Sequence, residues 1–120
     1  MKKVSFDFDG TLDKKHIQQF AIELINSGVD VYVNTTRFKK FDNSDLFEVV
    51  NSLGLSSDKV NFTNHTWKAE FFKENNLEFI WHLDDNYEEF FHFRRLNSKT
   101  KVIQVNSGNW KQKCIRLLNL

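Results

Sequence analysis

Two acidic residues near the start of the chain, Asp7 and Asp9, follow an apolar segment and precede a glycine. Residues two positions apart in a strand point to the same side, so both carboxylates would leave the strand end together and repel each other. A divalent metal ion is the natural counter-charge for such a pair. The spacing therefore predicts a metal site at the end of a strand.

Polar residues that could complete this site follow two other apolar segments. Thr35 to Arg37 come after Val29–Val33, and Asp84 and Asp85 come after Leu77–Leu83. Carboxylates together with carbonyl and water oxygens form a hard, oxygen-only site, which suits Mg²⁺ and is poor for zinc. Because magnesium favours phosphate oxygens as partners, the pattern indicates a site for a phosphorylated substrate.

These residue types are suited to phosphoryl transfer. A carboxylate is a competent nucleophile towards phosphorus, so Asp7 could attack the phosphoryl group and form an aspartyl-phosphate. Asp9 could protonate the leaving oxygen and then activate water. Thr35, Arg37 and a lysine could hold the phosphoryl group. The chemistry predicted from the residues is therefore phosphate ester hydrolysis.

The spacing of apolar residues predicts the elements that would position these groups. Runs of apolar and β-branched residues bounded by turn signals predict strands, and apolar residues at helical spacing predict helices. The predicted strands are Lys3–Phe8, Val29–Val33, Val60–Phe62, Leu77–Leu83 and Lys101–Val105. The predicted helices are Lys14–Ser27, Ser44–Leu53, Trp67–Asn75, Glu88–Leu96 and Asn109–Leu118.

Strands and helices alternate along the whole chain, which favours parallel βαβ units with right-handed crossovers. We therefore predict an α/β fold, a three-layer α/β/α Rossmann-like sandwich of about five mostly parallel strands. No linker or repeat interrupts the pattern, so residues 1–120 are predicted to form a single domain. In such a sheet the ligand site lies beyond the carboxyl ends of the strands, where the polar residues are expected to meet.

The start of the chain resembles the first motif of the haloacid dehalogenase superfamily. The segment Asp7–Leu12 is similar to the family's Asp-x-Asp-Gly-Thr sequence at the end of its first strand. The other motifs follow in the family's order, since Val31–Thr35, Lys68 and Phe79–Asp85 resemble the second, third and fourth. The resemblance covers most of the chain and implies a Mg²⁺-dependent phosphomonoesterase.

The resemblance also implies roles for the matching residues. Asp7 would be the nucleophile and a magnesium ligand. Asp9 would be the acid–base and would bind magnesium through its backbone carbonyl. Thr35 would hydrogen-bond the phosphoryl group, and Lys68 would stabilise charge on that group and on Asp7.

Other matching residues are expected at the metal ion or the substrate. Asp85 would bind magnesium directly, with Asp84 in support through a water; this acidic pair could also cap the following helix, a role compatible with metal binding. Thr11 in the first motif, together with Thr36 and Arg37 in the second, is expected to contact the substrate. The resemblance thus places the proposed metal ligands just after the ends of strands, and Lys68 at the start of a helix.

Two of these assignments have competitors. Thr36 competes with Thr35, because Asn34 is polar where the family usually continues an apolar strand. Lys73 competes with Lys68, and an exposed helix lysine is the alternative reading of Lys68. We favour Lys68 because it lies in the first turn of its predicted helix and faces the strand ends, whereas Lys73 lies more than a turn further along.

The chain leaves no room for the cap domain that many relatives insert after the first motif or between the second and third. An uncapped site implies a bulky substrate, such as a phosphoprotein or a nucleic-acid end, or an oligomer whose neighbours close the site. Minimally capped relatives also act on nucleotides. The segment Phe38–Phe41 is basic and aromatic, which suits nucleic acid, and a solvated loop anchored by two rings is its alternative interpretation.

Composition sets broader limits. The 120 residues are 40% apolar and 28% charged with a net charge of +1, so no global charge favours binding to nucleic acid or membrane. The single Cys114 excludes an intramolecular disulfide and fits a reducing interior. Because there is no signal pattern and no apolar run long enough to span a bilayer, we expect a cytoplasmic protein.

Two other functions compete with the phosphatase. One is a catalytically inactive phosphate- or metal-binding regulatory module, against which the presence of Asp9 argues. The other is a receiver domain, which also uses a phosphorylatable aspartate in a similar sheet. Receivers place their paired acids after the first strand, whereas Asp84 and Asp85 come after the fourth predicted strand. Motif order therefore favours the phosphatase.

Overall fold

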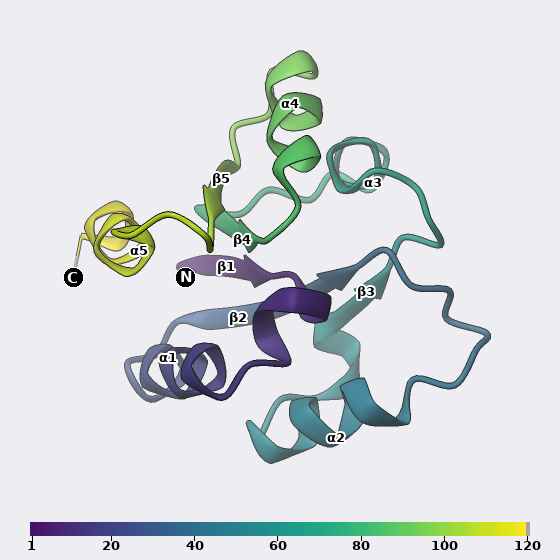
Figure 1. Cartoon of the computed structure of the whole chain (residues 1–120), viewed down its shortest axis with the longest axis vertical. Coiled ribbons are helices and arrows are strands. Elements are labelled where there is room, and N and C mark those ends of the chain that lie inside the picture. The colour runs from purple at the N-terminus through teal and green to yellow at the C-terminus, as the bar shows by residue number, and fades with distance from the viewer. Residues whose placement is uncertain (120) are drawn as a thin grey trace.

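The computed structural model describes residues 1–119, and its strands form one parallel five-stranded sheet (Figure 1). The strands are β1 (Lys3–Phe6), β2 (Asp30–Thr35), β3 (Val60–Phe62), β4 (Trp81–Asp84) and β5 (Lys101–Gln104). Their order is β3-β2-β1-β4-β5, so β1 is central and the chain crosses from β3 back to β4. The predicted α/β fold with parallel strands is confirmed.

Five helices cover the two faces of this sheet. They are α1 (Lys15–Asn26), α2 (Ser44–Ser52), α3 (Lys68–Glu74), α4 (Tyr87–Arg95) and α5 (Trp110–Leu118). Helices α1, α2 and α5 lie on one face and α3 and α4 on the other, which confirms the predicted three-layer sandwich (Figure 1). Within residues 1–119 no cap domain interrupts these elements. None of the described helices is long and apolar enough to cross a bilayer.

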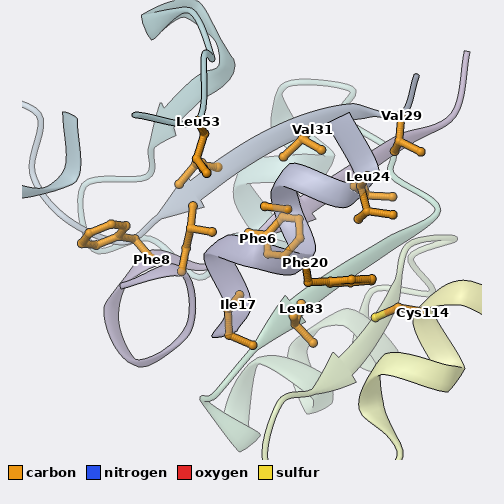
Figure 2. Close-up of a cluster of buried hydrophobic side chains, with 14 of the residues drawn as sticks. Phe6, Phe8, Ile17, Phe20, Leu24, Val29, Val31, Leu53, Leu83 and Cys114 are labelled. Atoms are coloured by element: carbon orange, nitrogen blue, oxygen red, sulfur yellow. The ribbon is translucent and has the colours of Figure 1, made fainter. Parts of the chain in front are cut away.

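The larger core lies between the sheet and helices α1, α2 and α5. Phe6 of β1 packs edge-on against Phe20 of α1 and Trp81 of β4, with ring centroids 6.2 and 5.4 Å away. Figure 2 shows Phe6 and Phe20 in this cluster, with Cys114 of α5 at its border. A smaller core on the opposite face surrounds Phe72 of α3. Aromatic burial on both faces therefore fixes β1 and β4 in the middle of the molecule.

The first predicted strand is two residues too long. β1 ends at Phe6, and residues Phe8–Leu12 form a wide helical turn in which the amide of Leu12 donates to the carbonyl of Asp7 at 3.1 Å. The backbone is left-handed at Gly10, where φ is +80°. Asp7 itself stays extended at the strand end, where its amide donates to the carbonyl of Leu83 of β4 at 2.9 Å, and the turn begins after it.

Two further strand boundaries differ from prediction by two residues or more. β2 continues to Thr35, two residues beyond the predicted end, because its polar end still pairs with β3. β4 begins at Trp81 rather than Leu77. The amide of Leu77 donates to the carbonyl of Phe72 at 2.8 Å and thereby closes α3, so the start of the apolar run is not available to the sheet.

Candidate functional site

A buried lysine joins two carboxylates at the carboxyl ends of the central strands. Asp7 directly follows β1, Asp84 is the last residue of β4, and Lys68 is the first residue of α3. Lys68 Nζ donates to Asp7 Oδ1 and to Asp84 Oδ2, each at 2.6 Å. All three side chains are buried. Because β1 and β4 are parallel neighbours, their ends deliver the two acids to the same place.

A third carboxylate, that of Asp85, lies at the more exposed side of this pair. One oxygen each of Asp7, Asp84 and Asp85 lie within 4.8 Å of one another. Asp85 also packs against Gly10, so closely that a Cβ there would lie 2.1 Å from Asp85 Oδ2. The donor set is made only of oxygens, which fits Mg²⁺ by its chemistry. These residues could hold such an ion.

Burial and charge act in opposite directions on these groups. Burial raises the pKa of Asp7 well above its ordinary value, although Lys68 opposes this. Burial alone would lower the pKa of Lys68, but the surrounding carboxylates hold it above the ordinary value. The pKa of Asp84 is lowered despite its burial, because His82 and Lys68 both donate to it. With more carboxylates than cations, the cluster favours an additional positive charge.

Glu89 of α4 is a fourth acid in the cluster. It is buried, and its Oε1 accepts from the Lys68 amide at 3.2 Å. Its Oε2 lies 3.8 Å from Lys68 Nζ and has no hydrogen-bond partner among residues 1–119. Burial raises the pKa of Glu89 to about 7. Lys68 is therefore held from the side of α4 as well as from the strand ends.

A chain of hydrogen bonds, buried from Asp84 to Asn34 and part-buried at Asn61, leads from Asp84 across the sheet. His82 of β4 lies 2.7 Å from Asp84 Oδ2 through Nε2 and 2.7 Å from Ser5 Oγ of β1 through Nδ1. Asn34 of β2 donates to Ser5 Oγ at 2.7 Å, and Asn61 of β3 donates to Asn34 Oδ1 at 3.0 Å. The chain therefore joins four strands on the face covered by α3 and α4.

One assignment of protons satisfies every member of this chain. Because Ser5 Oγ accepts from Asn34, its own hydroxyl is free to donate to His82 Nδ1. His82 is then neutral, with its proton on Nε2 donated to the Asp84 carboxylate, and burial also lowers the pKa of His82. Asp84 Oδ2 thus accepts hydrogen bonds from both His82 and Lys68. Asp84 is therefore positioned to hold Lys68, while its predicted support of a magnesium ion stays a prediction.

The competing assignments from sequence are distinguished by position. Lys68 is buried at the site, whereas Lys73 is exposed in the last turn of α3. Thr35 is buried at the end of β2, and its Oγ1 accepts from the amide of Arg37 at 3.3 Å. Thr36 lies just beyond β2 and is partly exposed. Thr11 is buried and donates to Asp7 Oδ2 at 3.1 Å, so it contacts the predicted nucleophile.

Asp9 lies apart from the buried cluster. Its side chain is 57% exposed and binds Arg37 at both oxygens, Oδ1 to Nη2 at 2.7 Å and Oδ2 to Nε at 2.9 Å. Asp45 of α2 binds the same guanidinium through two more hydrogen bonds, at 2.7 and 2.9 Å. The hydrogen bonds to Arg37 lower the pKa of Asp45 to about 2. Arg37, stacked 5.0 Å from the ring of Phe8, thus links the wide turn to α2.

A groove of about 550 Å³ opens beside Arg37. Phe38, Phe41 and His65 line it, with Phe38 stacked on His65 at 4.4 Å and edge-on to Phe41 at 5.5 Å. Asp42 and Asp45 line the same groove, so it is aromatic without being predominantly basic. Its rings could accept a flat aromatic group next to the site.

Sequence reasoning missed the supporting residues of the site. Glu89 lies in a helix whose sequence carries no chemical signal. The chain through the sheet did leave a signal, because Ser5, Asn34 and His82 are polar residues inside otherwise apolar strands. Their shared face could have been deduced from strand alternation, since His82 pairs with Ser5 in register.

No protein-family model matches the chain. No curated protein matches it either.

Proposed function

We propose that this protein is a Mg²⁺-dependent phosphomonoesterase of the haloacid dehalogenase type, acting through an aspartyl-phosphate on Asp7. The observation that supports this most is the cluster of Asp7, Asp84 and Asp85 at the carboxyl ends of β1 and β4, with buried Lys68 bridging the first two. It has the nucleophile, the oxygen ligands and the cation that phosphoryl transfer needs within one site.

Each residue has a defined part in the proposed reaction. An oxygen of Asp7 attacks phosphorus and forms an acyl-phosphate bond as the ester P–O bond breaks. Lys68 offsets charge on Asp7 and on the phosphoryl oxygens. The Thr35 hydroxyl, which donates no hydrogen bond within residues 1–119, is available to the phosphoryl group. Mg²⁺ bound by Asp7, Asp85 and the Asp9 carbonyl would supply positive charge against those oxygens.

Proton transfer is assigned to Asp9. Its carboxyl would protonate the leaving oxygen and then take a proton from the water that hydrolyses the acyl-phosphate. In the described conformation both oxygens of Asp9 accept from Arg37. The proposed reaction therefore includes a rotation of Asp9 towards Asp7, with Arg37 released to the phosphoryl group or retained by Asp45.

The Asp9–Arg37 pair also supports a second candidate, a catalytically inactive phosphate- or metal-binding module of the same fold. In that case the pair would stay closed and Asp7 would bind ligands without reacting. The two candidates differ in turnover and agree in Mg²⁺ binding, so both measurements are needed.

The substrate proposed for the enzyme is a nucleotide or a nucleic-acid end. The uncapped site is open to a large substrate, and the rings of Phe38, Phe41 and His65 beside Arg37 suit a base. A phosphoprotein is the alternative substrate, because an open site also admits a phosphorylated loop.

The test is hydrolysis of p-nitrophenyl phosphate and a panel of nucleotides, with and without Mg²⁺. We expect Mg²⁺-dependent turnover, lowered at least about a thousandfold by Asp7→Asn because the amide is not a nucleophile. Asp58→Asn, which makes the same change at an exposed position, serves as the matched control and should leave turnover unchanged. Equal activity of Asp7→Asn and parent would refute the mechanism; Mg²⁺ binding without turnover would favour the inactive module.

A further inference from the structure

A second groove, of about 580 Å³, is lined by residues of α4, β5 and α5. Figure 1 shows β5 with α4 and α5 on either side of it. Its apolar lining comes from Phe90 and Phe93 of α4, Val102 and Ile103 of β5, and Leu117 of α5. None of the residues assigned to the phosphatase site lines it. The groove is therefore a separate surface whose purpose the proposed reaction does not explain.

The floor of this groove is an open sheet edge, because within residues 1–119 β5 pairs only with β4. The amide of Lys101 donates to Ile80 and that of Val105 donates to Asp84, so alternate residues face β4. By the same alternation the amides of Val102 and Gln104 face the open edge. An extended chain placed there could pair with them as an additional strand.

The rim of the groove is basic. Its four positive side chains are those of Arg94, Lys101, Lys113 and Arg116. Among the described residues, none that lines the groove is acidic. Within residues 1–119 none of the four forms a salt bridge. These four positive charges lie around one groove, although the net charge of the whole chain is only +1. The rim therefore favours a negatively charged partner.

The charge also decides between possible occupants. A second copy paired through β5 would bring two such rims together, and like charges across an interface are unfavourable. A nucleic acid would neutralise the basic rim but would leave the apolar floor without an apolar surface to pack against. A polypeptide strand with alternating apolar and acidic side chains would make all three kinds of contact. Its acidic side chains would pair with the basic rim, its apolar side chains would pack on the floor, and its backbone would accept from the free amides.

We propose that the β5 edge is a docking site for an acidic, extended segment of a partner protein, which adds to the sheet beside β5. Its apolar side chains would lie on the α4 side of the sheet, against Phe93 and Val102, and its carboxylates on the α5 side. Its carboxylates would face the rim that includes Lys101 and Arg116. The binding is independent of Asp7 chemistry and does not rest on the phosphatase proposal.

The test uses fluorescence polarisation with the full chain and a labelled hexapeptide of alternating valine and glutamate. We expect binding that weakens with salt and falls at least about tenfold in a Lys101→Glu/Arg116→Glu variant. A Lys39→Glu/Lys40→Glu variant makes the same charge change on another surface and should bind as the parent does. Circular dichroism checks that each variant folds.

Backbone pairing is tested on the peptide itself, so no folding defect of the protein can interfere. N-methylation of the valines and N-methylation of the glutamates block opposite edges of the peptide strand. We expect only one of the two peptides to lose binding. Equal binding of both would overturn strand addition. Absence of binding to the unmethylated peptide, preferential binding of an oligothymidylate, or a dimer dispersed by Lys101→Glu would overturn the proposed partner.

Discussion

Replacing Gly10 by alanine tests whether Asp85 binds the metal ion from its described position. Gly10 has a φ of +80°, and a Cβ there would lie 2.1 Å from Asp85 Oδ2 and 2.6 Å from its Cγ. Gly28 and Gly54 have φ values of +85° and +76°, but neither has an atom within 4 Å of such a Cβ. Alanine would therefore be in a strained backbone conformation at all three positions. Of the three, only an alanine at position 10 would also collide with another side chain, that of Asp85.

The two costs can be estimated separately. A left-handed conformation costs an L-residue about 1–2 kcal/mol, which lowers the melting temperature of a domain of this size by several degrees, about 4 °C per kcal/mol. All three Gly→Ala variants should show this loss. No contact of 2.1 Å can persist, so Gly10→Ala must also displace the Asp85 carboxylate. Moving a ligand should weaken Mg²⁺ binding by about tenfold or more.

The assay is thermal unfolding of the four proteins at rising Mg²⁺ concentration. Bound Mg²⁺ stabilises the folded state in proportion to ln(1 + [Mg²⁺]/Kd), so a weaker site needs more ion for the same shift. We expect the parent, Gly28→Ala and Gly54→Ala to respond alike and Gly10→Ala to respond less. A full response of Gly10→Ala would show that Asp85 is not a ligand from its described position. No response in any of the proteins would refute the Mg²⁺ site.

Two further predictions follow from buried groups outside the metal ligands. Burial raises the pKa of Glu89 to about 7 from an ordinary 4.5, so the folded state binds its proton more tightly and loses stability as pH rises from 4.5 to 7. Glu89→Gln should therefore gain up to about 3 kcal/mol over the parent across that range in urea unfolding, and a constant difference would contradict this. Cys114, buried with a pKa raised to about 12, should react with Ellman's reagent only as the protein unfolds; immediate labelling of the native protein would contradict its burial.

The meeting of Asp7, Asp84 and Lys68 was predictable because it follows from topology. Parallel strands deliver their carboxyl ends to one edge, so acids that follow two neighbouring strands must approach each other. The position of Lys68 was also predictable, because the first turn of a helix that follows a parallel strand lies at that same edge. What these residues do there stays a prediction, because their roles depend on a substrate.

Other features of the site depend on contacts between residues far apart in the chain. The guanidinium of Arg37 could have reached Asp7 or a phosphate as easily as Asp9 and Asp45, and only side-chain packing selects among them. Glu89 is six residues from the end of its helix and becomes buried only because α4 packs against α3. Periodicity identifies such a helix without indicating which polar side chain it turns inward.

The hydrogen-bonded chain through the sheet also limits how the strands align as the protein folds. A slip of one residue turns apolar faces outward, whereas a slip of two keeps them inward and is tolerated by hydrophobic burial alone. With β2 displaced by two residues, Asn34 would leave Ser5 and Asn61, and each buried group left unpaired costs about 1–3 kcal/mol. The polar residues thus stabilise one strand alignment over others in which the apolar residues would be buried equally well.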